Sequence, residues 1–243
     1  EIGESGQLKL ANAKVLIIGL GGLGNPVAAY LAAAGVGQLY LLDDDHVELS
    51  NLQRQILYRT EQVKHSKSQA AAAQLGQQNP LVTLSPICQR FSTDSSGYTL
   101  VADVDLVIDC SDNMVTRQQI NQACVQYKTA LIVGAAIGFD GQLVSFDASE
   151  SESACYHCLY PFSDTEGPQN CASLGILGPV VGTIGSLQAL EAIKYLTDLT
   201  MPSFNRLLRF DGNTLQSQHL MISKNSDCDV CGSHKESSNE IND

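Results

Sequence analysis

Short apolar runs recur through the first 135 residues and are separated by segments with helical character. Residues 14–19 (KVLIIG) form the first run, which predicts a strand buried on both faces of a parallel sheet. The alanine-rich segment 25–34 follows and favours a helix. The alternation continues with predicted strands at 38–43, 82–87, 104–109 and 130–134 and predicted helices at 64–78 and 113–127. It indicates an α/β fold with a Rossmann-like, doubly wound, mostly parallel sheet.

The pattern changes after Gly138. Residues 142–147 (QLVSFD) alternate between apolar and polar, which predicts a half-exposed antiparallel strand. Glycine, proline and small polar residues over 163–179 predict a long irregular loop, a class that is often functional. Residues 180–199 have helical spacing, and 206–222 predict a hairpin that turns at Asp211-Gly212-Asn213. The parallel sheet is therefore expected to be extended by C-terminal antiparallel strands.

Length and charge restrict the class of protein. The chain has 243 residues, of which 44% are hydrophobic, so it can bury a substantial core, and we favour one domain. Its net charge of −12 argues against sequence-independent binding of nucleic acid, which needs clustered Lys and Arg. No apolar run approaches the roughly 20 residues of a membrane span, and no secretory leader opens the chain. We expect no membrane association and a cytoplasmic setting. The sequence begins at Glu1 without an initiator Met, so we expect a preceding segment.

A glycine-rich motif joins the first predicted strand to the first predicted helix. Gly19, Gly21 and Gly24 form G-x-G-x-x-G, with Gly22 inside it. Glycines at such a turn bring backbone N–H groups against phosphates at a helix N-terminus. Close packing alone is the other explanation of the motif. Asp43 ends the next predicted strand about 20 residues later, where an acidic residue commonly binds ribose hydroxyls; the alternative is an acidic loop start, since two more aspartates follow.

Charged residues follow two of the strands. Arg54 and Lys67 offer the cations that stabilise a pyrophosphate leaving group, although a single Arg or Lys is by default a solvated surface charge. Asp112 follows the strand at 104–109, at the end of the sheet where ligands bind. Its carboxylate could hold Mg²⁺ or could cap the helix that begins near Asn113.

Four of the eight cysteines are arranged as two C-x-x-C pairs. Such pairs supply four thiolates to a tetrahedral Zn²⁺ and leave no open coordination position, which predicts a structural zinc knuckle rather than a catalytic metal. Redox-active C-x-x-C is the rival interpretation. His157 lies inside the first pair and is expected to be a bystander. The predicted zinc ligands are Cys155, Cys158, Cys228 and Cys231.

The remaining cysteines differ in setting. Cys171 lies in the predicted loop, where exposure would permit a reactive thiolate, but the sequence leaves open whether it is a nucleophile or incidental. Cys88, Cys110 and Cys124 lie in apolar strands or helices and are expected to be small core residues.

Seven ordered motifs, from about Gly6 to Gly232, resemble the E1-like (HesA, MoeB and ThiF) adenylyltransferase superfamily. The thiazole branch, whose members activate the sulfur carrier ThiS in thiamine biosynthesis, is most similar, because QNCASLGILGPVVG resembles its crossover loop and FDG follows the last long helix. The molybdenum-cofactor branch of MoeB is nearly as similar. The motifs are GLGGLGNP, LLDDD, SNLQRQ, DCSDNMVTR, CYHCLYP, GPVVGTIGSLQALEAIKYL and CDVCG.

The resemblance implies an enzyme that uses ATP to adenylate the C-terminal Gly-Gly carboxylate of a ubiquitin-like carrier. It implies a homodimer, a separate sulfur donor protein, and Cys171 as an acyl acceptor or sulfur-transfer thiol. Residues 1–135 would form the ATP-binding half and 136–234 the carrier- and zinc-binding half of one domain, before a polar tail at 235–243. The implied nucleotide and Mg²⁺ ligands are Asp43 for ribose, Asn51, Arg54 and Lys67 for the triphosphate, and Asp112 for Mg²⁺, beside the glycines 19, 21, 22 and 24.

Two readings of another class stay open. An NAD-dependent oxidoreductase could use the same glycine turn, although no hydride-transfer site can be identified in the sequence. A non-catalytic carrier-binding scaffold would fit the absence of the family's N-terminal helix with its R-Y-x-R-Q pattern, whose Arg reaches the ATP of the neighbouring subunit in the family that this chain resembles.

Overall fold

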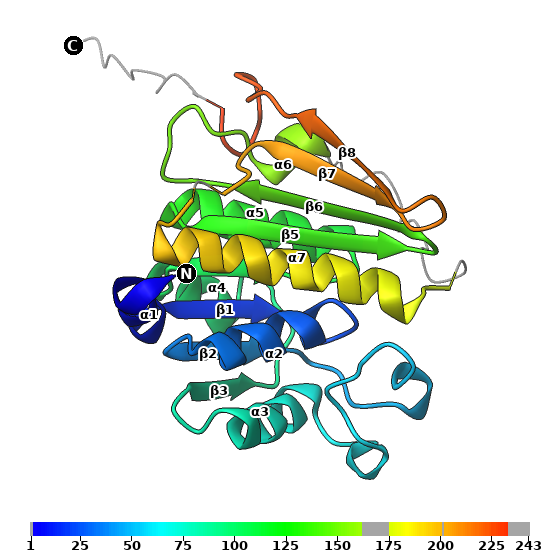
Figure 1. Ribbon diagram of the computed structural model, residues 1–243. Coiled ribbons are helices and arrows are strands. Elements are labelled where there is room, and N and C mark those ends of the chain that lie inside the picture. The colour runs from blue at the N-terminus through cyan, green and yellow to red at the C-terminus, as the bar shows by residue number, and fades with distance from the viewer. Residues whose placement is uncertain (1, 162–174, 201, 233–243) are drawn as a thin grey trace, which may run out of the picture.

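The computed structural model describes residues 2–161, 175–200 and 202–232. Its centre is an eight-stranded sheet with the order β3-β2-β1-β4-β5-β6-β7-β8 (Figure 1). The first five strands along the chain pair in parallel and the last three are antiparallel, as the sequence predicts. The strands are β1 (Lys14–Ile18), β2 (Gln38–Leu42), β3 (Thr83–Ile87), β4 (Leu106–Asp109), β5 (Ala130–Ile137), β6 (Asp140–Phe146), β7 (Arg206–Asp211) and β8 (Gln216–Met221).

Helices cover both faces of the sheet. In Figure 1, α2 and α7 lie on the viewer's side and α5 lies behind. The first layer contains α1 (Gly3–Asn12), α2 (Gly24–Ala34), α3 (Lys67–Gln78) and α7 (Gly178–Thr197). The second contains α4 (Ser96–Leu100), α5 (Met114–Tyr127) and α6 (Tyr156–Leu159), and single 3-10 turns lie at Leu49–Asn51, Thr60–Gln62 and Val101–Asp103.

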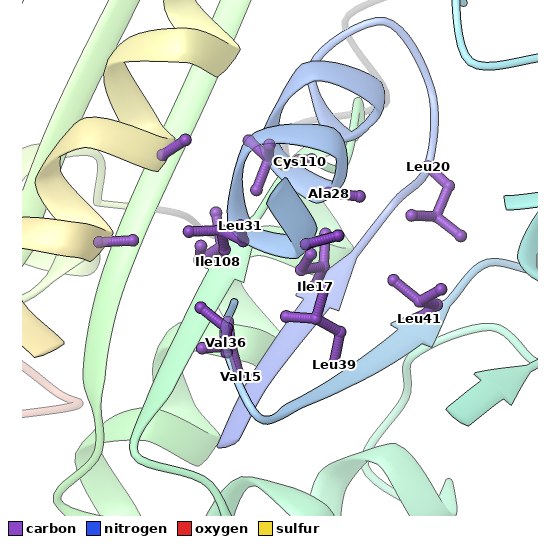
Figure 2. Close-up of a cluster of buried hydrophobic side chains, with 14 of the residues drawn as sticks. Val15, Ile17, Leu20, Ala28, Leu31, Val36, Leu39, Leu41, Ile108 and Cys110 are labelled. Carbon is purple, nitrogen blue, oxygen red and sulfur yellow. The ribbon is translucent and has the colours of Figure 1, made fainter. Parts of the chain in front are cut away.

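Alternating residues of the parallel strands fill two cores. Figure 2 shows Val15 and Ile17 of β1 beneath Leu31 of α2, and all three side chains are fully buried. The intervening Leu16 of β1 points to the opposite core, with Ile120 of α5. The strand is therefore buried on both faces, as its continuous apolar run predicts.

One helix was missed by the hydrophobic pattern, and one expectation from it is wrong. Helix α1 was not predicted, because it is mostly polar and buries only Gly6 and Leu10. Strand β6 is not half-exposed: its last four residues are buried, because α7 contacts one face while Val144 and Phe146 join the second core. The exposed strand is β8, in which all six residues are exposed.

The glycine turn packs backbone against backbone. Gly19 has a φ of +89°, and a Cβ there would lie 2.7 Å from the carbonyl oxygen of Cys110. A Cβ on Gly24, the first residue of α2, would lie 2.0 Å from the carbonyl oxygen of Gly19. Only glycine allows α2 to begin directly over the end of β1.

We expect Gly24→Ala to lower the free energy of unfolding by about 3 kcal/mol or more, because the added methyl group must displace backbone. Gly182→Ala is the matched control. It also lies in a helix, but its Cβ would meet nothing within 4 Å, so it should stabilise the protein by up to about 1 kcal/mol. Urea denaturation of both variants measures the difference, and equal effects would contradict the packing argument.

Candidate nucleotide and metal sites

The carboxyl ends of β1, β2 and β4 bring together the loops that carry most of the predicted nucleotide ligands. The contact of Gly19 with Cys110 places the glycine turn against the loop after β4. The N–H of Leu20 donates to Asp43 Oδ2, at the end of β2, over 2.6 Å. Three adjacent strands thus present their loops at one edge, which is where open α/β sheets bind ligands.

Two side chains also hold Leu20 in place by donating hydrogen bonds to its carbonyl oxygen. Asn25 Nδ2 and the Tyr58 hydroxyl each donate to it over 2.8 Å. Among the described hydrogen bonds, the N–H groups of Gly21, Gly22 and Leu23 donate none. These three donors precede α2 directly, so they can bind a phosphate at the positive end of its dipole. The glycine turn therefore serves packing and leaves donors free at the same time.

Asp43 is the buried member of the acidic triplet. Its Oδ1 accepts from the N–H of Asp45 over 2.8 Å and its Oδ2 accepts from Leu20. Burial raises the pKa of Asp43 and the nearby Lys67 opposes that effect. Each oxygen retains a second lone pair, so the carboxylate can still accept a hydroxyl proton. Asp44 instead pairs with Arg90, at 3.2 Å.

The segment that follows β2 holds Asn51, Arg54 and Lys67 beside the glycine turn. Asn25 Oδ1 accepts from the N–H of Leu57 over 2.9 Å, which ties this segment to α2. The Tyr58 hydroxyl lies 3.4 Å from the carbonyl oxygen of Lys67 as well as bonding to Leu20. These bonds hold Leu57, Tyr58 and Lys67 next to the turn, and a Cβ on Gly21 would lie 3.7 Å from Nε2 of Gln55, the residue that directly follows Arg54.

The two predicted triphosphate cations differ in setting. The Lys67 side chain is only 7% exposed, and its Nζ lies 2.8 Å from Asp45 Oδ2, so it is not an ordinary solvated charge. Arg54 is half-buried and its Nη1 donates weakly to the carbonyl oxygen of Ser50, over 3.4 Å. Within the described residues, Arg54 forms no ion pair. Its guanidinium is available to a polyanion.

Asp112 is exposed between β4 and α5. The capping alternative for it is wrong, because the N-cap of α5 is Asn113, whose Oδ1 accepts from the N–H of Thr116 over 2.9 Å. The Asp112 carboxylate is thus an exposed oxygen donor at the ligand-binding edge, the kind of ligand that Mg²⁺ takes.

The N-terminus of α7 meets the same region. A Cβ on Gly178 would lie 2.7 Å from the carbonyl oxygen of Gln53, next to Arg54. The last residue of the predicted loop before α7 therefore lies one position from a contact with the segment of Arg54. Cys171 lies outside the described residues.

The four predicted metal ligands gather in one cluster. The Sγ of Cys155 lies 4.0 Å from that of Cys158 and 3.8 Å from that of Cys228, and Cys158 Sγ lies 3.4 Å from Cys231 Sγ. A zinc tetrahedron with Zn–S bonds of about 2.3 Å has sulfur–sulfur edges of about 3.8 Å. The cluster therefore fits a Zn²⁺ ion.

The surroundings of the cluster suit thiolates. Asn121 Nδ2 donates to Cys155 Sγ over 3.5 Å, and the N–H of Asn225 donates to Cys158 Sγ over 3.5 Å. Burial raises the pKa of Cys155 to about 11, so metal binding at neutral pH would displace its proton. His157 is a bystander, as expected, with its Nδ1 3.1 Å from Gln118 Oε1. Cys110 and Cys124 are buried as predicted, whereas Cys88, just past the edge strand β3, is exposed.

Sequence reasoning missed several residues that hold the site together. Asn25, Tyr58 and Arg117 are buried and bond to backbone groups of the nucleotide loops. Asn25 and Arg117 lie inside motifs, but only long-range contacts show their role.

A separate open hollow of about 790 Å³ lies at the amino ends of β1 and β4. Leu8 and Lys9 of α1 line it together with Tyr195 of α7. It is at the opposite end of the strands from the candidate nucleotide site.

The sequence model that describes the ThiF family matches residues 1–230 of this chain. The chain belongs to the ThiF family. It is 50% identical over 232 residues to the sulfur carrier protein ThiS adenylyltransferase of Escherichia coli, covering 96% of this chain and 91% of that protein. It is 42% identical over 227 residues to the molybdopterin-synthase adenylyltransferase of Salmonella typhimurium, covering 93% and 90%.

Solved structures show the same fold at lower identity. The microcin C7 biosynthetic enzyme MccB of E. coli superposes with a TM-score of 0.81 and 24% identity, covering 94% of this ThiF family chain and 70% of MccB. None of the described helices is both long and apolar enough to cross a membrane.

We expect purified, reduced protein to contain about one zinc per chain, because four clustered thiolates complete a tetrahedral site. Cys228→Ser should lose the metal and lower the melting temperature. Cys88→Ser, an exposed cysteine outside the cluster, is the control and should retain both. Elemental analysis and thermal melting test this, and full zinc content in Cys228→Ser would contradict the assignment.

Proposed function

We propose that this ThiF family protein uses ATP to adenylate the C-terminal Gly-Gly carboxylate of a small ubiquitin-like sulfur carrier protein, releasing pyrophosphate. The observation that carries the proposal is that the N–H groups of Gly21, Gly22 and Leu23 donate no hydrogen bond within the described residues, at a turn that is tied to the segment of Arg54 and the buried Lys67. A triphosphate carries several negatively charged oxygens, which can accept hydrogen bonds from these N–H groups and pair with the two cationic side chains. The names of the two relatives above support the carrier as the second substrate.

The reaction needs no general base. A C-terminal carboxylate has a reference pKa near 3.5 and is ionised at neutral pH. Its oxygen bonds to the α-phosphorus while the bond between that phosphorus and the bridging oxygen of the β-phosphate breaks, and the electron pair leaves with pyrophosphate. Arg54 and Lys67 stabilise the charge that develops on the leaving group. Asp112 would hold Mg²⁺, which neutralises phosphate oxygens when bound.

Asp43 and Asn51 complete the proposed nucleotide contacts. The lone pairs left on Asp43 would accept the ribose hydroxyls, since this carboxylate is fixed at the end of β2. Asn51 is buried and precedes Arg54 by three residues in the chain, and it would contact the triphosphate.

The carrier is proposed to be ThiS-like, with a role in thiamine thiazole biosynthesis, because the identity is 50% to the ThiS enzyme and 42% to the molybdopterin-synthase enzyme. A MoaD-type carrier, as activated by MoeB, is the second candidate. Comparing pyrophosphate exchange with each purified carrier separates the two. The absence of exchange with both would favour a non-catalytic scaffold or an oxidoreductase instead.

We propose that residues 1–135 bind ATP and that residues 136–234 bind the carrier and zinc. Exposed apolar side chains at Leu220 and Met221 of β8 support a protein-binding role for the second half. A structural zinc in the cysteine cluster would anchor this hairpin. A homodimer, a separate sulfur donor protein and a cytoplasmic setting are proposed from the family resemblance.

Arg54→Ala and Lys67→Ala should each lower carrier-dependent pyrophosphate exchange by about 100- to 1,000-fold, since each removes a charge directed at the transition state. Lys9→Ala is the control, because Lys9 pairs with Asp198 at the other end of the sheet. Wild-type exchange in Arg54→Ala or Lys67→Ala would mean that the phosphates bind elsewhere.

Cys171→Ser should keep pyrophosphate exchange and lose any covalent adduct with the carrier, if the thiol acts after the acyl-adenylate forms. The hydroxyl is similar in size but far less ionised than a thiol with a reference pKa near 8.5. Mass spectrometry under non-reducing conditions measures the adduct, with Cys88→Ser as control. A wild-type adduct in Cys171→Ser would remove Cys171 from the mechanism and favour the MoeB-like alternative.

A further inference from the structure

A buried arginine supports the loop that carries Asp112. Arg117 of α5 donates from Nη2 to the carbonyl oxygen of Ser111 over 2.6 Å and to that of Gly134 in β5 over 3.0 Å. Ser111 precedes Asp112 directly in the chain. The guanidinium therefore holds the proposed Mg²⁺ loop against the sheet.

The charge of Arg117 is balanced within the protein. Burial by itself would lower the pKa of Arg117, but the neighbouring Asp109 carboxylate and the nearby Tyr156 side chain raise it. Asp109 is fully buried, and its Oδ1 accepts from the N–H of Ser111 over 2.8 Å. A buried cation has few alternative acceptors, so moving Ser111 away from Arg117 would carry a large penalty.

The same helix face reaches the cysteine cluster. Asn121 follows Arg117 by one turn of α5 and donates from Nδ2 to Cys155 Sγ over 3.5 Å. Its Oδ1 accepts from the N–H of Tyr156 over 2.8 Å. Tyr156 follows Cys155 directly, and its side chain lies close enough to Arg117 for the two to interact electrostatically. Asn121 and Arg117, one turn apart on α5, therefore link the cysteine cluster and the Asp112 loop through the same helix face.

We propose that Arg117 is a positioning residue for the nucleotide loop and that Tyr156 couples it to the cysteine metal site, so that metal binding and nucleotide binding strengthen one another. The inference rests on the proposed function, because the coupled loop is the one assigned to Mg²⁺ and ATP. A coupling between sites is reciprocal: nucleotide must raise the affinity for zinc by the same factor by which zinc raises the affinity for nucleotide.

The test uses full-length wild-type protein, Tyr156→Phe and the control Tyr160→Phe. Tyr156→Phe keeps the ring and removes the hydroxyl through which Tyr156 interacts electrostatically with Arg117. Tyr160 is a matched neighbour: its ring centroid lies 5.3 Å from that of Tyr156, but its hydroxyl donates to Gln142 Oε1 over 2.7 Å. Calorimetry gives the Kd of a non-hydrolysable ATP analogue with Mg²⁺. Competition with a chromophoric chelator gives the zinc affinity with and without that analogue.

We expect the analogue to tighten zinc binding by about fivefold or more in wild type and in Tyr160→Phe. Tyr156→Phe should retain a wild-type melting temperature in the zinc-loaded state, weaken analogue binding by a similar factor and lose the coupling. If wild-type protein binds the analogue but its zinc affinity does not change when the analogue is present, this inference is overturned and the proposed function stands. Wild-type coupling in Tyr156→Phe also overturns it. Failure of wild-type protein to bind the analogue overturns both.

Discussion

Contact of backbone with backbone at the glycine turn is the constraint on which the nucleotide site depends. Gly24 lies against the carbonyl of Gly19, and Gly19 lies against the carbonyl of Cys110, with no space for a side chain at either point. This closeness sets where α2 begins relative to β1 and β4. It also places the loop of Asp112 next to the N–H groups of the turn that donate no hydrogen bond within the described residues. One packing requirement therefore defines both parts of the candidate phosphate site.

Four of the five buried charged side chains in the described part of the chain lie around this contact. Asp43, Lys67, Asp109 and Arg117 are all buried near the carboxyl ends of the strands. Such groups are costly to remove from water unless backbone dipoles or opposite charges surround them. Their partners include N–H and carbonyl groups of the loops themselves, so the polar groups of the site are oriented before a substrate arrives. Preorganised dipoles of this kind are worth more to catalysis than groups that must turn during the reaction.

The sequence predicted those features whose cause is local. Apolar runs identified the strands, alanine-rich segments identified the helices, and the two C-x-x-C pairs predicted a cluster that forms although they are far apart in the chain. Features that depend on distant neighbours were missed or mistaken. The polarity of α1 hid a helix that packs on α7, and the alternation in β6 suggested a solvent-facing side that other elements cover. Tyr58 and Arg117 act through contacts with distant carbonyl groups, which no local pattern reveals.

The spacing of the cysteine pairs has a consequence for biosynthesis. Cys155 and Cys228 are 73 residues apart, as are Cys158 and Cys231, so the second pair leaves the ribosome long after the first. Strands β1 to β5 and their helices are complete before that moment and can fold as a unit during translation. The last hairpin must then close a long loop, whose entropy a bound metal would offset. In a zinc-starved cell, we expect newly made chains to have a folded parallel half and a C-terminal hairpin that is not anchored. Proteases could then cleave this hairpin.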